Sequence, residues 1–315
     1  MAFMINYFTS IDNCVSKIDA PEKGCWINVV DPEPEEIALL RDEFHIDKEY
    51  IKSSLDDEES ARIEKEDDQT FIIFDVPYAE REDDDILYYT MPVGVVILHD
   101  YVVTISGKDN PVVQDFAQGV VKNVKTSFKT EFVLKMMFRM ATRFLQYLKQ
   151  IDKHSYNLEI RLRQSMKNKE LVQLLGLEKS LVYFQTSLKS NNAMLEKTLR
   201  GKHLKLYEED VELLEDVLIE MKQALEMTDI YTSVLSGTMD AFASVISNNL
   251  NISMKFLAAL TIIISIPTIV FSFYGMNIGE QAGALPFGGT IWIPLALTVV
   301  LTGVVTWILY KKKMF

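Results

Sequence analysis

The residues best placed to carry chemistry are oxygen-bearing side chains on one stripe of an otherwise apolar segment near the C-terminus. Between residues 251 and 272, positions at alternating steps of three and four hold most of the polar side chains, while Leu, Ile, Val and Phe dominate the other positions. The stripe consists of Asn251, Met254, Ala258, Thr261, Ser265, Thr268 and Ser272. Steps of this size place all seven side chains on one face of a helix.

Two explanations compete for this stripe. Small and hydroxylated residues allow close packing between membrane helices, and in an arbitrary helix that is the commoner cause. The alternative is a pore, in which hydroxyls and an amide line a narrow wet path that has no ionised group to trap an ion. Because two helices per chain cannot enclose such a path, the pore hypothesis requires several subunits arranged around one axis.

Two apolar segments must position the stripe. Residues 254–274 carry no charge except Lys255 at their start, and residues 291–310 carry none. About 20 residues suffice to cross a hydrocarbon core of about 30 Å, so both segments are predicted to be transmembrane helices. Their predicted ends hold aromatic residues, which prefer the membrane interface. These residues are Tyr274, Trp292, Trp307 and Tyr310.

The distribution of positive charge predicts the orientation of this hairpin. Lys255 and the lysines at 311–313 lie on one side, whereas the loop at 275–290 contains no Lys or Arg and one acid, Glu280. By the positive-inside rule, both termini are cytoplasmic and the loop is external. The N-terminus lacks the basic and apolar regions of a signal peptide. The expected protein is a multi-pass protein of the cell (plasma) membrane, with the lipid bilayer as a partner.

The charge of the chain is concentrated in its first part. The 315 residues carry a formal net charge of −13, almost all of it before Lys255, which predicts an acidic soluble domain. Cys14 and Cys25 are expected to be free thiols, and the four histidines lack the spacing of a zinc site. We find no GxxxxGK[ST] phosphate loop and no nucleophile–base pair. An enzyme is therefore the least favoured class, and neither an organic cofactor nor a nucleic-acid partner is expected.

Residues 1–127 mix short strands with helices. Strands are predicted over 71–78, 86–100 and 101–106, where β-branched and aromatic residues are frequent. A helix is predicted after Asp31 and Pro32, in PEPEEIALLRDEF. The expected result is an α/β domain with a small sheet.

After Ser127 the strand signals stop and long helices follow. Helices are predicted over 131–163 and 169–199, with a turn at 200–202, and from Glu208 only Gly237 interrupts the pattern before Pro267. From Leu214 to Ile246, apolar residues and threonines recur at steps of four and three, which is a heptad seam. This seam alone favours a bundle helix that buries one face, and a seam between subunits is the alternative.

The tetrapeptide Tyr274-Gly275-Met276-Asn277 stands at the outer end of the first predicted transmembrane helix, before a short loop and a final helix that ends in lysines. In this position, after an acidic α/β domain and a long helix, it resembles the signature of the CorA family of magnesium transporters. The segments WINVVDPEPEEIALLRDEF (26–44) and RIEKEDDQTFIIF (62–74) also resemble the family's N-terminal domain. The resemblance covers nearly the whole chain.

The resemblance implies a CorA-like, funnel-shaped homopentamer. Each subunit would combine an α+β cytoplasmic domain and a long helical stalk with two C-terminal transmembrane α-helices, the first of which lines the pore. The expected segments are a cytoplasmic α/β domain (1–127), a helical hairpin (128–204), a stalk helix (205–253), transmembrane helices at 254–274 and 291–310, an external loop (275–290) and a basic cytoplasmic tail (311–315).

The resemblance also implies roles for individual residues. The selectivity filter at the outer mouth would comprise Gly275, Met276 and Asn277. Pore or gate positions of the family match Asn251, Met254, Leu257 and Thr268, which the other stripe residues join by periodicity. A ring of neutral amide oxygens can hold hydrated Mg²⁺ through its water molecules without stripping them. Such a ring also binds weakly enough for the ion to leave.

The external loop departs from the family pattern. Many members have a Met-Pro-Glu segment soon after Gly-Met-Asn, whereas this chain has IGEQAGALPF. Glu280 is a candidate outer-mouth acid that would concentrate cations by its field. A solvated loop acid without function is the alternative.

The implied function is channel-like uptake of Mg²⁺, with Co²⁺ and Ni²⁺ as further candidate substrates, driven by the membrane potential and gated by intracellular Mg²⁺. In the family, Mg²⁺ held between subunits by carboxylates keeps the pore closed, and Asp240 in GTMDAF matches such a position. Its expected partner in the next subunit is one of Asp83, Asp84 and Asp85. Solvated surface is the alternative for any acidic run.

Two rival functions stay open. A transporter of zinc or another divalent cation could share the architecture, although zinc favours His or Cys ligands and the loop has neither. A membrane-anchored coiled-coil sensor or scaffold would explain the heptads and the anchor. It leaves the hydroxyl stripe and the YGMN motif unexplained.

Overall fold

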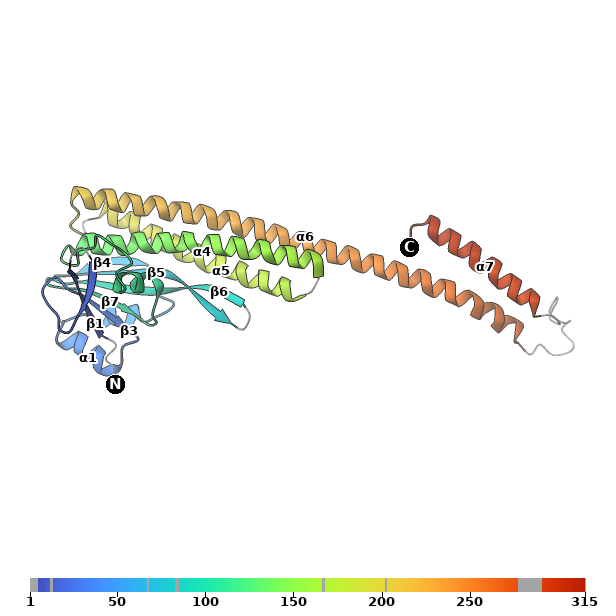
Figure 1. Ribbon diagram of the computed structural model, residues 1–315, viewed down its shortest axis with the longest axis horizontal. Coiled ribbons are helices and arrows are strands. Elements are labelled where there is room, and N and C mark those ends of the chain that lie inside the picture. The colour runs from blue at the N-terminus through green and yellow to red at the C-terminus, as the bar shows by residue number, and fades with distance from the viewer. Residues whose placement is uncertain are drawn as a thin grey trace. The chain divides into compact units, whose positions relative to one another are not determined.

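The computed structural model describes residues 5–11, 14–66, 68–82, 85–165, 168–201, 203–276 and 291–314. The chain divides into two compact units, Met1–Gly237 and Thr238–Phe315. Figure 1 labels the elements, and each unit is described by itself.

The first unit is built on a seven-stranded sheet with the order β2-β1-β3-β7-β6-β5-β4. The strands are β1 (Ile5–Ile11), β2 (Cys14–Ile18), β3 (Trp26–Val30), β4 (Arg62–Glu66), β5 (Gln69–Glu82), β6 (Asp85–Ile97) and β7 (Val102–Ser106). The β3–β7 pair is parallel and all other pairs are antiparallel. Three predicted strands correspond to β5, β6 and β7, whereas β1, β2, β3 and β4 were not predicted.

The β5–β6 hairpin extends beyond the rest of the sheet. The pairing of β4 with β5 ends at Ile73, and that of β7 with β6 ends at Gly94. Pro77 and Pro92 both lie in the extension, where each strand has one strand neighbour instead of two. A proline cannot donate to a sheet ladder, so it is tolerated where one side of the strand is an edge.

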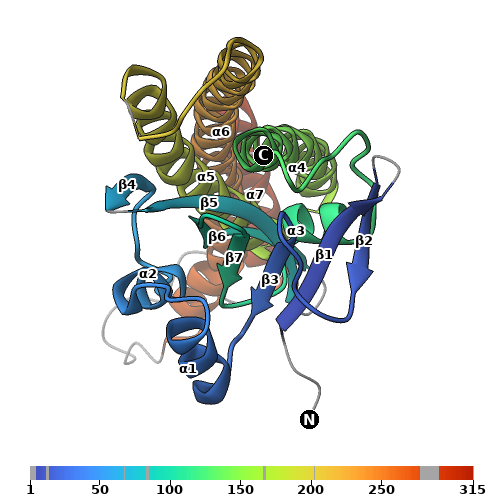
Figure 2. The same ribbon diagram turned by 90° about the vertical axis from the view of Figure 1, so that its left-hand side faces the viewer.

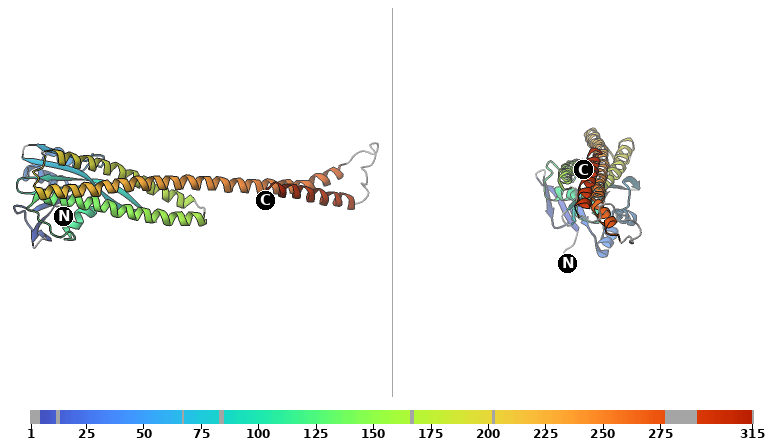
Figure 3. Two further views of the ribbon diagram at one scale, coloured as in Figure 1. Left: turned by 90° about the horizontal axis from the view of Figure 1, so that it is seen from above. Right: turned by 90° about the vertical axis from the view of Figure 1, so that its right-hand side faces the viewer.

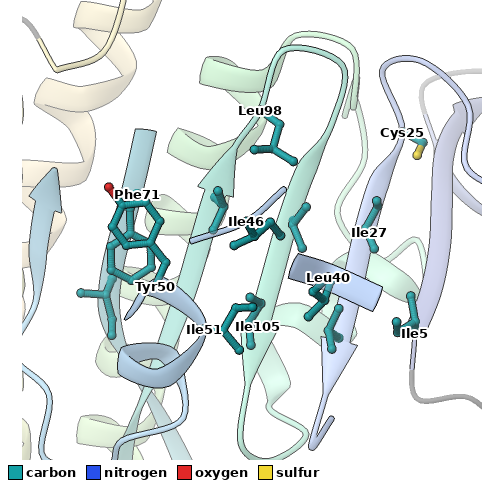
Figure 4. Packing of buried hydrophobic residues seen from close by; sticks show 14 residues of the cluster. Ile5, Cys25, Ile27, Leu40, Ile46, Tyr50, Ile51, Phe71, Leu98 and Ile105 are labelled. Carbon is teal, nitrogen blue, oxygen red and sulfur yellow. The ribbon is translucent and has the colours of Figure 1, made fainter. Parts of the chain in front are cut away.

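Two short helices, α1 (Pro34–Asp42) and α2 (Lys48–Ser54), cover one face of the sheet (Figure 2). The carboxylate of Glu36 accepts the backbone N–H of Glu33 at 3.0 Å, and Asp47 accepts that of Glu49 at 2.7 Å. These bonds satisfy donors that a helix start leaves free. Leu40 and Ile51 pack into the cluster shown in Figure 4, where Tyr50 stacks on Phe71 with ring centroids 4.4 Å apart.

The opposite face of the sheet is covered by α3 (Pro111–Ala117), α4 (Lys129–Ser165) and α5 (Asn168–Arg200) (Figure 2). Trp26 is fully buried there, between Phe8 and Phe132 of α4. Its indole N–H donates to Thr104 Oγ1 at 2.8 Å. Sheet and helices therefore share one continuous core.

Helix α6 (Glu208–Tyr274) begins in the first unit, and within that unit it buries the heptad seam inside its own chain. Leu214, Met221 and Thr228 are fully buried. The side chain of Gln185 on α5 donates to Asp229, which joins the two helices. This part of the seam thus acts as the buried face of a bundle helix, which the pattern alone had favoured.

Candidate ion pathway

The second unit contains the two helices that the sequence predicts to be transmembrane. Helix α6 continues through Pro267 to Tyr274, and α7 spans Trp292–Lys311 (Figure 3). Both are long and apolar enough to cross a membrane. A proline inside such a helix is tolerated because neighbouring groups can satisfy the freed backbone carbonyl.

The face that α6 buries within this unit is apolar. Between residues 254 and 274, Ala259 and Val270 are buried, and the intervening Ile263 and Ile266 are half-buried. On α7 the buried positions are Pro294, Thr298 and Leu309. Small side chains at such positions let two helix backbones approach closely.

The polar stripe lies on the other side of α6. At 3.6 residues per turn, its centre is roughly 140° around the helix from Ala259 and Val270. Ser265 is half-buried, and every other member of the stripe is exposed in the single chain. Packing against the chain's own α7 therefore does not account for the stripe.

Three hydroxyls of the stripe donate to the carbonyl four residues earlier. Thr261 donates to Leu257 at 2.8 Å, Ser265 to Thr261 at 2.7 Å and Thr268 to Ile264 at 3.3 Å. Each hydroxyl has a single hydrogen, so these oxygens present lone pairs to their surroundings. The exposed face of α6 is therefore a row of hydrogen-bond acceptors without formal charge.

The remaining predicted pathway residues fall at the two ends of this row. Asn251, Met254 and Leu257 are exposed at its start, and Gly275 and Met276 are exposed at its end. The N–H of Gly275 donates to the carbonyl of Phe271 at 2.9 Å, which is an ordinary helical bond made just after Tyr274, the last residue of α6. A Cβ at Gly275 would lie 3.1 Å from the same carbonyl oxygen. Asn277 and Glu280 lie outside the described residues.

The candidate regulatory acids are only partly covered by the structure. Asp240 is exposed on α6. Asp85 begins β6 and pairs with Glu82 at the end of β5, while Asp83 and Asp84 lie outside the described residues. Among the residues that the structure describes, no three His, Cys, Asp or Glu side chains are grouped so that they could hold a metal ion.

No role was predicted from the sequence for the threonines of α7. Thr298 donates to Pro294 at 2.7 Å and Thr306 to Thr302 at 2.7 Å, and Thr298 is buried. The spacing of four residues between Thr298, Thr302 and Thr306 was the sequence signal that could have identified them. The two helices thus carry similar hydroxyls, but Thr298 of α7 is buried whereas the stripe of α6 is exposed.

Nearly the whole chain matches known proteins. A family model described as CorA-like Mg2+ transporter protein matches residues 21–312. The cobalt/magnesium transport protein CorA of Methanocaldococcus jannaschii is 28% identical over 298 residues, which cover 91% of this chain and 90% of the relative.

Solved structures share the fold. The complete CorA magnesium transporter of Methanocaldococcus jannaschii superposes with a TM-score of 0.80 at 24% identity and covers 98% of both chains. The ZntB cytoplasmic domain of Vibrio parahaemolyticus has a TM-score of 0.59 at 13% identity, covering 80% of this chain and 99% of that domain. With its α/β domain, long helix and two membrane spans, the chain belongs to the CorA-like Mg2+ transporter family, whose members are divalent-cation transporters of the cell membrane and not enzymes.

Proposed function

We propose that this protein is a homopentameric channel for Mg²⁺ uptake, in which the polar stripe of α6 lines a central pore. The observation that carries the proposal is that the stripe faces away from α7 and is exposed in the single chain. A polar face inside a bilayer needs water, protein or ion against it. Copies of the same stripe around one axis satisfy this requirement.

The acceptor character of the stripe suits a hydrated cation. Mg²⁺ dehydrates reluctantly, and the waters of its first shell direct their hydrogens outward. The hydroxyl oxygens of Thr261, Ser265 and Thr268 have donated their hydrogens within the helix and can accept from those waters. Asn277 is the proposed filter residue at the outer mouth, with Gly275 and Met276, and Glu280 is the proposed outer acid.

The membrane potential suffices as the driving force. A divalent ion that enters a cell with a negative interior gains about 4.6 kcal/mol per 100 mV. This requires both termini to be cytoplasmic, as the lysines at 311–313 and the neutral-to-acidic loop favour. Uptake then needs no nucleotide hydrolysis.

The test is Mg²⁺ entry into liposomes that contain the purified protein, with a fluorescent Mg²⁺ reporter and an imposed negative interior potential. Uptake should follow the potential and be lost in Asn277→Ala. If folded wild-type protein does not admit Mg²⁺ when the interior is low in Mg²⁺, the proposal is wrong. Parallel assays with Co²⁺, Ni²⁺ and Zn²⁺ then decide whether another divalent ion is the substrate.

A matched pair of variants tests the stripe itself. Thr268→Val and Thr298→Val each remove one hydroxyl that donates to its own helix, and each keeps the shape of the side chain. Thr268 is on the exposed stripe, whereas Thr298 is buried. Uptake should fall in Thr268→Val and stay near wild type in Thr298→Val. Equal effects would mean that the hydroxyls of α6 support packing rather than conduction.

We also propose that intracellular Mg²⁺ closes the pore by bridging carboxylates of neighbouring subunits. The candidates are Asp240 on one subunit and Asp83, Asp84 or Asp85 on the next. Without the ion, like charges repel and loosen the interface.

Removal of Mg²⁺ from the interior should open the wild-type channel, and its return should close it. A variant with Asp240, Asp83, Asp84 and Asp85 changed to Asn should stay open at high internal Mg²⁺. The control variant changes Asp56 and Asp57, which precede β4, to Asn. Inhibition that is unchanged in the test variant would exclude these four residues as the sensor.

A further inference from the structure

Three consecutive lysines, at positions 311–313, lie at the end of the second membrane span, and Lys255 stands at the start of the first. Both places lie at the same boundary of the membrane, because the chain crosses once in each direction. From residue 241 onward the sequence holds a single acid, Glu280, and its loop belongs to the opposite boundary. The last acid before the spans, Asp240, is about 22 Å along α6 from Lys255 at 1.5 Å per residue. The sequence of the second unit therefore places no carboxylate near these lysines.

The backbone around the lysines is fixed by the way α7 ends. The N–H of Met314 donates to the carbonyl of Leu309 at 3.2 Å, and that of Lys313 donates to the carbonyl of Tyr310 at 3.0 Å. These two bonds form a Schellman motif, in which the residue after the C-cap adopts the left-handed conformation. That residue is Lys313, whose φ is 53°. The motif therefore holds the lysines in a defined turn.

Lysine is an uncommon residue at this position of the motif. Glycine is favoured there, because in the left-handed conformation a Cβ comes too close to the following carbonyl oxygen. Lys313 thus places a positive charge where glycine would suit the backbone better. A role for its ammonium group, rather than for its conformation, accounts for this choice.

Two aromatic side chains beside the lysines lie away from the buried side of α7. Leu309 is 6% exposed, whereas Trp307 and Tyr310 are 63% and 73% exposed. At 3.6 residues per turn, Trp307 and Lys311 both lie roughly 160° around the helix from Leu309. The ammonium of Lys311 is 5.5 Å from the centroid of the Trp307 ring. Tryptophan and tyrosine near the end of a span prefer the level of the lipid headgroups. The outer surface of α7 therefore presents an aromatic ring and an ammonium group together at the membrane boundary.

We propose that Lys311, Lys312 and Lys313, together with Trp307, form a binding surface for anionic phospholipid headgroups. By the positive-inside rule this end of α7 faces the cytoplasm, and the anionic lipids of that leaflet attract basic segments next to a span. A lipid phosphate accepts charge-assisted hydrogen bonds from ammonium groups. The proposal depends on the membrane spans and not on the pore, so it can fail while the proposed function holds.

The test measures how lipids quench the fluorescence of Trp307 in full-length protein reconstituted into vesicles. The vesicles contain phosphatidylcholine and phosphatidylglycerol in equal amounts, with bromine on the acyl chains of one lipid or the other. The chain offers its own control, because Trp292 is 73% exposed at the other end of α7, roughly 22 Å away at 1.5 Å per residue. The third tryptophan, Trp26, is fully buried in the first unit. Trp292→Phe isolates the lipid-dependent signal of Trp307, and Trp307→Phe isolates that of Trp292.

The lysine variants are made in the chain that carries Trp292→Phe. The test variant changes the lysines at 311–313 to Gln, and a second variant changes them to Arg, which keeps the charge. The control variant changes Lys17, Lys122 and Lys149, which are exposed in the first unit, to Gln and removes the same charge. Lys313→Gly removes one charge and suits the left-handed backbone, so it tests the surface if the triple Gln variant does not fold.

Around Trp307 we expect phosphatidylglycerol to be enriched over phosphatidylcholine by at least about threefold, and this preference should fall as salt is raised. The Arg variant and the first-unit control should keep the preference, whereas the Gln variant should reduce it to less than about 1.5-fold. Lys313→Gly should lower the preference without lowering the melting temperature, and Trp292 should show none. Equal quenching by the two lipids in wild type, the same preference at Trp292, or a preference that survives in the Gln variant would refute the surface and leave the lysines a role in membrane orientation alone.

Discussion

Asn191 of α5 satisfies both backbone groups of Asp75 in β5. The amide oxygen of Asn191 accepts the N–H of Asp75 at 2.9 Å, and the amide nitrogen donates to the carbonyl of Asp75 at 2.8 Å. The pairing of β4 with β5 ends at Ile73, so this position of β5 has no strand neighbour on that side. A helix side chain thus replaces the missing strand at the base of the hairpin.

Replacing Asn191 with Ala should destabilise the first unit by about 2–4 kcal/mol, since two backbone groups lose their partners. Asn191 is fully buried, so water cannot take its place without rearrangement. The measurement is the free energy of unfolding in denaturant. Asn192→Ala is the control, because that amide is half-buried and bonds to Glu196 on its own helix. A loss no larger than the control's would show that the two bonds are dispensable.

Asp75→Asn should stabilise the first unit at neutral pH, in contrast to Asn191→Ala. Burial raises the pKa of the Asp75 carboxyl, and a hydrogen bond with Ser187 opposes the rise in part. The pKa of Asp75 is therefore higher in the folded state than in the unfolded chain. The protonated carboxyl stabilises the fold fully at a pH below the ordinary carboxyl pKa, and this contribution is lost as the pH rises through the folded-state pKa. The neutral Asn should therefore raise the melting temperature at about pH 7 and make little difference near pH 4. A variant that is less stable at neutral pH would show that the ionised carboxylate is needed.

Gly94 of β6 is expected to tolerate no side chain. A Cβ there would lie within 1.7 Å of Ser54 Oγ on α2, and that hydroxyl already donates to the carbonyl of Tyr50 at 2.6 Å. Gly94→Ala should cost about 1–3 kcal/mol by overpacking. Ser54→Gly in the same chain should recover part of the loss, which a double-mutant cycle of unfolding free energies measures. Additive effects of the two substitutions would contradict a direct clash.

Apolar side chains on the outer surface of α6 should support the proposed self-assembly. Ile230 and Val234 are 58% and 62% exposed in the single chain, next to the Gln185–Asp229 contact with α5. Ile230→Lys with Val234→Lys should shift the purified protein toward smaller species, because unpaired charges are costly in a buried interface. The subunit number is read by mass photometry.

The control for this experiment is Val120→Lys, which adds a charge at a similarly exposed apolar position after α3. Circular dichroism verifies that all variants keep their helices. If the test variant assembles as wild type does, this surface of α6 is not an interface between subunits.

Helix positions were well determined by the sequence. The predicted helices at 131–163 and 169–199 correspond to α4 and α5, and the two apolar segments correspond to the end of α6 and to α7. Local periodicity and the Gly and Pro breaks between segments carry this information, and the membrane segments need no partner to be recognised. The strands were harder, because β1, β2 and β4 each combine one or two buried positions with half-buried and exposed ones, which gives a weak apolar pattern.

The stripe on α6 separates what the sequence predicts from what only the tertiary structure shows. Periodicity alone placed Thr261, Ser265 and Thr268 on one face, but it could not say whether that face meets α7. The structure decides this, because Ala259 and Val270 are the positions buried within the unit. A periodic pattern defines which residues share a face, whereas the partner of each face depends on contacts between segments that are distant in the sequence.

The two hydrogen bonds between Asn191 and Asp75 had no sequence signal at all. Asn191 lies 116 residues from Asp75, and the hydroxyl of Tyr88 in β6 meets the amide oxygen of Gln150 on α4, 62 residues later. The sequence by itself determined the membrane spans, the long helices and the family to which the YGMN motif points. Only the tertiary structure decided which polar groups meet, because those meetings depend on how a sheet and three long helices pack in space.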